Sequence, residues 1–136
     1  MLGQFHQEKK HVIWMFKNKS GGYWIENYVK GFTSEKRNIL SKQEMLGKWN
    51  DILVNVKWTH KEDGFFKVWV NNKLAYDYKG QTKSKSVKTY YKFGIYRSWI
   101  SKYKSYHKGK EVPTQVVYFD EVRAGKTKEK VIGNLK

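Results

Sequence analysis

Two short stretches of the sequence carry side chains that can hold anions and move protons. In 89–97, apolar and polar residues alternate, which predicts a β-strand with two different faces. The face expected to enter the core holds Tyr91, Phe93 and Ile95. The opposite face offers an amine, a glycine gap and two phenols, from Tyr90, Lys92, Gly94 and Tyr96. An ammonium and a phenol on one surface can bind an anion and transfer a proton.

The second stretch, 3–6, places Gln4 and His6 on one face of an expected strand, about 7 Å apart. The ordinary pKa of histidine suits proton transfer near neutral pH. Taken alone, such a pair is also typical of a polar outer strand face. Lys92 and Tyr96 lie roughly 13 Å apart along a strand, so without a bulge or bend they line one groove rather than touch.

The sequence contains no clear motif for binding a metal or a cofactor. The chain has no cysteine, which excludes disulfides and thiolate chemistry. His60, Glu62 and Asp63 are candidate metal ligands, but they fall in a tight turn where polar residues are expected anyway. No phosphate-binding glycine motif is present. We therefore expect no metal and no cofactor.

The charge narrows the class of partner. With 28 Lys and Arg against 12 Asp and Glu, the net charge is +16. Such a chain attracts nucleic acid, anionic polysaccharide or an anionic surface, although a merely solvated lysine-rich surface is the simpler alternative. No signal-peptide pattern opens the chain, and no apolar run approaches the roughly 18 residues of a membrane span.

The pattern of short alternating segments predicts an all-β antiparallel sandwich or barrel. Its 136 residues suit one domain, with 126–136 as a charged tail. A three-stranded meander is expected over 49–78, after a hairpin over 11–30 and a weaker strand within 32–40. The segment 41–48 is either a loop or a short helical turn. A basic aromatic loop over 98–113 precedes a last strand over 114–122. Three further groups, Lys57, Lys67 and Trp69, would join Lys92 and Tyr96 on one polar face of a curved sheet, which suits sugar rings and carboxylates.

Four stretches together resemble the jelly-roll polysaccharide lyases, the group with heparin lyase I, glucuronan lyase and, more distantly, alginate lyases. They are GQFH at 3–6, GKWND with VKW and GFFKVWVNN at 47–72, YYKFGIYR at 90–97 and VYFDEV at 117–122. The likeness covers most of 3–125 and implies a single concanavalin-like jelly-roll domain over 1–125.

The resemblance implies β-elimination at a 4-linked uronic acid, with catalytic residues Gln4, His6, Lys92 and Tyr96. Gln4 and Lys92 would stabilise the charge that develops on the substrate carboxylate. His6 would remove the C5 proton and Tyr96 would protonate the leaving oxygen, or Tyr96 would do both. Substrate contacts are expected from Lys57, Lys67, Trp69, Tyr90 and Arg97. The substrate would be alginate, glucuronan or a heparin-like polymer, and the location extracellular or periplasmic.

The resemblance implies strands and an arginine-bearing stretch before the Gln-x-His strand, and from the start at Met1 we expect this chain to lack them. We expect an exposed sheet edge or uncovered core face, which a second copy could cover. The main alternative to a lyase is a non-catalytic module that binds anionic carbohydrate on the same scaffold. Nucleic-acid binding through cations and stacking aromatics is a further alternative, without a recognisable motif behind it.

Overall fold

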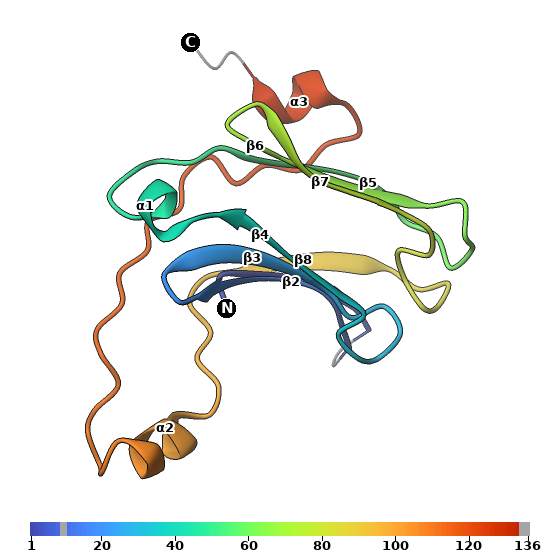
Figure 1. The fold of residues 1–136 in the computed structure, drawn as a ribbon. Helices are drawn as coiled ribbons and strands as arrows, with labels where there is room; N and C mark the ends of the chain where they lie inside the picture. Colours follow the sequence, from blue (N-terminus) through green and yellow to red (C-terminus); the bar gives the residue numbers. More distant parts are fainter. Residues whose placement is uncertain (9–10, 134–136) are drawn as a thin grey trace. The chain divides into compact units, whose positions relative to one another are not determined.

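A computed structural model describes residues 1–8 and 11–133. The chain forms two compact units, Met1–Ser98 and Trp99–Lys136. The first unit holds both β-sheets and the second holds two short helices (Figure 1).

A five-stranded antiparallel sheet forms one layer of the first unit (Figure 1). Its spatial order is β4-β3-β2-β1-β8, so the first and last strands of the unit are neighbours. The strands are β1 (Gly3–Gln7), β2 (His11–Lys19), β3 (Gly22–Asn27), β4 (Glu35–Leu40) and β8 (Thr89–Phe93). Ser20 and Gly21 both have positive φ, which gives the β2–β3 hairpin the turn that matches strand twist.

A three-stranded sheet forms the other layer, with β5 (Ile52–Lys57), β6 (Phe65–Val70) and β7 (Lys73–Lys79) in sequence order. The meander expected over 49–78 is confirmed. Asn71 and Asn72 both have positive φ at the β6–β7 turn, a conformation that asparagine tolerates better than most residues.

Aromatic rings fill the space between the two sheets. Trp14 on β2 stacks on Phe66 of β6 with centroids 4.1 Å apart, and both rings are fully buried. Phe5 on β1 contacts Trp58 and Phe66 across the same layer, at 5.2 and 5.7 Å. The Trp14 indole N–H donates to the Thr82 carbonyl at 2.9 Å, which satisfies a polar atom inside the core. The expected all-β antiparallel sandwich is confirmed.

A short helix, α1 (Lys42–Met45), occupies the segment expected to be a loop or helical turn. Ser41 and Glu44 cap its first turn reciprocally, Glu44 donating its backbone N–H to Ser41 Oγ and accepting from the Ser41 N–H. Across residues 1–8 and 11–133, no helix is both long and apolar enough to cross a membrane.

The strand expected over 89–97 is shorter in the structure. β8 ends at Phe93, because Gly94 takes a φ of 124° that breaks the regular ladder. Backbone contact with the start of the chain continues, since Gly94 N–H donates to the Leu2 carbonyl and Tyr96 N–H to that of Met1.

The apolar face of this strand is not buried, which corrects the expected core face. Tyr91 contacts Phe5 at 4.6 Å between centroids but keeps 41% of its surface exposed. Phe93 and Ile95 are 54% and 42% exposed within the described chain. β8 is the edge strand of its sheet, so it has a neighbour on one side only.

The second unit, described to residue 133, contains helices where a loop and a charged tail were expected. α2 (Ile100–Tyr106) lies within the basic aromatic segment, and Lys102 Nζ sits 5.4 Å from the Trp99 ring and 5.7 Å from that of Tyr106. α3 (Lys128–Ile132) lies in the charged tail. The strand expected over 114–122 is wrong: the segment is irregular, and residues 99–133 supply no strand with which it could pair.

We expect the inward and outward positions of β6 to differ sharply in their effect on stability. Phe66→Ala removes a ring at the centre of the core and should lower the free energy of unfolding by about 3–5 kcal/mol. Phe65→Ala, one residue earlier on the outer face, should cost about 1 kcal/mol or less. Urea unfolding measures both, and equal losses would contradict the layer assignment.

Candidate active site on the outer face of the large sheet

The pairing of β1 with β8 brings the two predicted chemical stretches together. Gln4 lies opposite Lys92, and His6 lies opposite Tyr90. The next positions along, Phe5 and Tyr91, are also partners and point into the sandwich, where Phe5 meets Trp58 and Phe66. Because side chains alternate across a strand, Gln4, His6, Tyr90 and Lys92 share the outer face of the large sheet.

Side-chain contacts tie all four of these residues into one cluster. His6 Nε2 and Gln4 Oε1 lie 2.7 Å apart. The amide oxygen only accepts, so Nε2 carries the proton and Nδ1 carries the lone pair in the neutral ring. The His6 ring stacks on Tyr90 with centroids 5.3 Å apart, and Lys92 Nζ lies 5.5 Å from the same Tyr90 ring. The Tyr90 hydroxyl donates to the Glu8 carbonyl, which fixes that ring.

His6 is held in its neutral form. Burial is the main cause that lowers its pKa below the usual 6.5, and the positive charge of Lys92 and the nearby His11 act in the same direction. Only 6% of His6 is exposed, and its Nδ1 finds no hydrogen-bond partner within the described part of the chain. Its lone pair is therefore enclosed rather than presented to solvent.

Tyr96 and Arg97 lie past the end of β8. The Tyr96 backbone bonds to that of Met1 in both directions, N–H to carbonyl at 2.9 and 2.8 Å. Gln4 and Lys92 thus lie between Tyr96 at one end of the strand pair and His6 at the other. Tyr96 is 54% exposed, far more than His6. Gly94, with its φ of 124°, lies between Lys92 and Tyr96, so the two residues do not belong to one regular strand.

The expectation that Lys57, Lys67 and Trp69 share one polar face with Lys92 and Tyr96 is wrong. Lys57 belongs to β5, and Lys67 and Trp69 to β6, all in the small sheet. Lys67 and Trp69 alternate with the buried Phe66, Val68 and Val70, so they face away from the sandwich on its opposite side. The alternation of apolar and polar residues could not reveal the separate sheets. It shows which side chains of one strand share a face, but not which sheet the strand joins.

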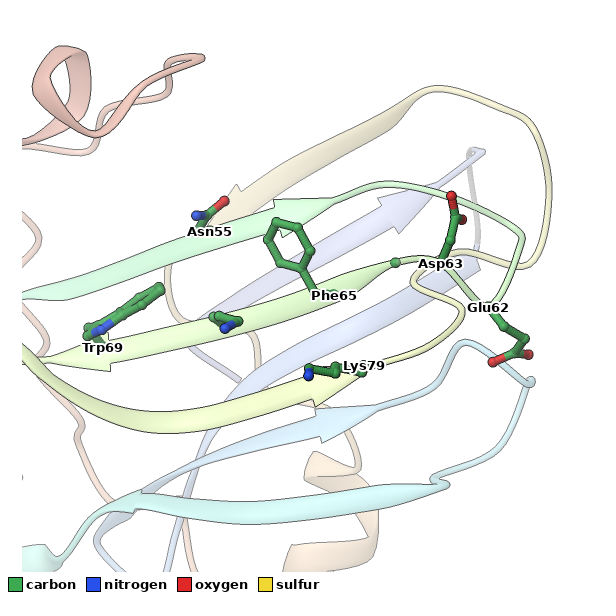
Figure 2. A pocket seen from close by; sticks show the side chains of 8 residues that line it. Asn55, Glu62, Asp63, Phe65, Trp69 and Lys79 are labelled. Carbon is green, nitrogen blue, oxygen red and sulfur yellow. The ribbon is translucent and has the colours of Figure 1, made fainter.

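The small sheet has its own shallow depression, of about 590 Å³, on this opposite face (Figure 2). Phe65 and Trp69 stand on it beside Asn55. Two lysines and two carboxylates line it, namely Lys67, Lys79, Glu62 and Asp63. Lys67 also lies 3.3 Å from Asp77. This charge balance makes the depression a poorer match for a polyanion than the outer face of the large sheet.

Several groups on the outer face of the large sheet were missed from the sequence. Glu26, opposite Met15 in the row that contains Gln4, is buried and binds both Lys17 and Tyr28. Lys19 Nζ lies 5.4 Å from the Trp24 ring. Trp24, Glu26 and Tyr28 recur every second residue, and this alternation was the available signal. We refer to the surface formed by β1, β2, β3 and β8 on this side as the outer groove face, after the groove expected from the sequence.

Chemically, this face combines amide donors, ammonium groups, a neutral imidazole and a phenol. The described residues contain no group of three or more His, Cys, Asp or Glu side chains placed to share a metal ion. The arrangement is suited to holding an anionic group near Gln4 and Lys92.

Comparison with known proteins adds one positive finding. A family model described as polysaccharide lyase matches residues 1–123, and thus nearly the whole chain. No curated protein and no solved structure gives a match. The match includes both strands that build the outer groove face at Gln4 and Lys92. The chain therefore belongs to the polysaccharide lyase family.

Proposed function

We propose that this protein cleaves an anionic, uronic-acid-containing polysaccharide by β-elimination on the outer groove face. The observation that carries the proposal is the β1–β8 register, which sets Gln4 opposite Lys92 and His6 opposite Tyr90. Membership of the polysaccharide lyase family supports a polysaccharide as the partner.

The reaction requires an acidic C–H bond and a leaving group on neighbouring carbons. A base takes the proton from C5, next to the carboxylate. The C–H electron pair forms the C4–C5 double bond, while the C4–O bond breaks and its oxygen receives a proton. One product carries an unsaturated uronate and the other a new hydroxyl end. No oxidant or reductant is needed.

Gln4 and Lys92 are suited to hold the carboxylate as negative charge builds on it. Gln4 Oε1 is occupied by His6, which leaves the amide N–H groups as donors. Lys92 lies in the same row, one strand spacing or roughly 5 Å away in backbone terms. Donors arranged before the reaction stabilise developing charge more effectively than water, which must reorganise.

Tyr96 is the more accessible of the two candidates for proton transfer. Its exposure lets a polymer approach, whereas the His6 lone pair is enclosed at Nδ1. We assign to Tyr96 both removal of the C5 proton and its return to the leaving oxygen. His6 then acts as a positioning residue, because its Nε2–H fixes the orientation of the Gln4 amide.

The variants Lys92→Met and Tyr96→Phe should both slow the chemical step. Without the phenol, kcat should fall by about 10²–10⁴-fold with little change in affinity. Loss of the Lys92 charge should lower kcat by about 10²-fold. The assay follows ultraviolet absorbance of the unsaturated product from glucuronan, alginate and heparin.

Lys73→Met, a change of equal charge at the exposed start of β7, serves as the control and should behave as wild type. If the wild type binds these polymers but yields no unsaturated product from any, the protein is a carbohydrate-binding module and the lyase proposal is wrong. Tighter binding to DNA than to polyuronate at two salt concentrations would favour nucleic acid.

The pKa of His6 should respond to Lys92. Since Lys92 lowers the His6 pKa, Lys92→Met should raise it towards 6.5 without reaching it, because burial is the larger cause. Proton NMR titration of the imidazole C–H, assigned by its loss in His6→Gln, measures this. An unchanged or lower pKa would contradict the cross-strand arrangement.

The free energy of unfolding should depend on pH through the same residue, His6. In the unfolded chain His6 takes up a proton near pH 6.5, whereas in the folded chain its pKa is lower. The free energy of unfolding should therefore be highest above pH 6.5 and should fall as the pH drops below that value. Unfolding titrations of wild type and His6→Gln measure the effect, and the variant should lose less stability over that window. Equal losses would show that His6 is not the residue responsible.

A further inference from the structure

Lys17, Glu26 and Tyr28 form a bonded cluster on the outer groove face. Lys17 Nζ lies 2.6 Å from Glu26 Oε1, and the Tyr28 hydroxyl donates to Glu26 Oε2 at 2.8 Å. Only 3% of the Glu26 side chain is exposed, against 28% for Lys17. The carboxylate is thus enclosed with a donor on each oxygen, while the lysine still reaches the surface.

This arrangement orients a cation. A buried carboxylate destabilises a fold unless it is paired and hydrogen-bonded, and here Lys17 and Tyr28 fulfil both needs. The ammonium group of Lys17 has three N–H donors, and the ion pair leaves others to face outwards. A lysine held in this way loses less side-chain freedom on binding an anion than a free surface lysine does.

The cluster flanks Gln4 on the side opposite Lys92. β2 neighbours β1, and Met15 lies opposite Gln4. Lys17 is two residues further along β2, so it lies one strand spacing of roughly 5 Å and one step of roughly 7 Å from Gln4. Lys92 lies one strand spacing away in the other direction. The backbones of Lys17 and Lys92 are therefore roughly 12 Å apart, which is more than the length of one sugar ring.

We propose that Lys17, held by Glu26 and Tyr28, is a further anion-binding group of the groove. It takes the carboxylate or sulfate of a sugar adjacent to the one held by Gln4 and Lys92. This inference rests on the proposed function, and it narrows the substrate class to polymers that carry negative charge on neighbouring sugars.

The test uses a double variant that leaves net charge unchanged. Lys17→Met with Glu26→Gln removes one positive and one negative charge, and the new amide oxygen still accepts from Tyr28. A control double variant, Lys67→Met with Asp77→Asn, removes an ion pair from the opposite face of the sandwich, and its lysine is about as exposed as Lys17, at 31% against 28%. Affinity electrophoresis in glucuronan, alginate or heparin gives the Kd, with dextran as an uncharged comparison.

The Lys17 double variant should bind its best polyanion about threefold to tenfold more weakly than wild type, with the shift in KM rather than kcat. The control double variant should change Kd by less than about twofold. Equal affinities of wild type and the Lys17 double variant, or equal losses in the two double variants, would overturn the proposal. If the double variant does not fold, Lys17→Gln should show the loss and Lys17→Arg should not.

The outcomes separate this inference from the proposed reaction. Weakened binding by the Lys17 double variant, with no unsaturated product from wild type, would end the lyase proposal and keep the anion-binding role. If wild type forms the unsaturated product and the Lys17 double variant has an unchanged KM, the lyase proposal is kept and the anion-binding role of Lys17 is wrong. A change in melting temperature alone, without a change in Kd, would mean that the cluster only stabilises the sheet.

Discussion

The antiparallel pairing of β1 with β8 is the contact on which the rest of the site depends. These strands come from opposite ends of the first unit, and their register alone sets Gln4 beside Lys92 and His6 beside Tyr90. A shift of one residue would turn every side chain of β8 to the other face. The register is held on the inner side by Phe5 against Tyr91, and on the outer side by the stack of His6 on Tyr90.

The same pairing gives the two faces of the large sheet different roles, core packing on the inner face and polar side chains on the outer face. Inward residues of β1 and β2, chiefly Phe5 and Trp14, join the small sheet through Phe66. Because the inward residues form the core, polar residues on the outward face do not reduce its apolar packing. His6 and Glu26 are both buried on that outward side. Each is fixed by its neighbours and in turn fixes a polar side chain, Gln4 for His6 and Lys17 for Glu26.

Alternation in the sequence was enough to predict an all-β sandwich or barrel, the 49–78 meander and the shared face of Lys92 and Tyr90, and the family resemblance favoured the sandwich. It could not place Lys67 and Trp69, because strand pairing, not alternation, decides which sheet a strand joins. Nor could it foresee that β8 stops at Phe93, since a positive φ at Gly94 is permitted by glycine but not required by it. Glu26 was overlooked because its charge suggested solvent, whereas Lys17 and Tyr28 satisfy it within the sheet. The segment 114–122 has a strand-like pattern without a described partner, and pattern alone does not make a strand.

The central claim is that a polyanionic sugar binds the outer groove face rather than the depression on the small sheet. Mapping backbone amide chemical shifts of the full chain during titration with a short oligoglucuronate tests it most directly. The account predicts that the largest shifts fall on β1, β2 and β8, around Gln4, Lys17 and Lys92. Shifts centred on β6, around Phe65 and Trp69, with β1 and β8 unmoved, would contradict it.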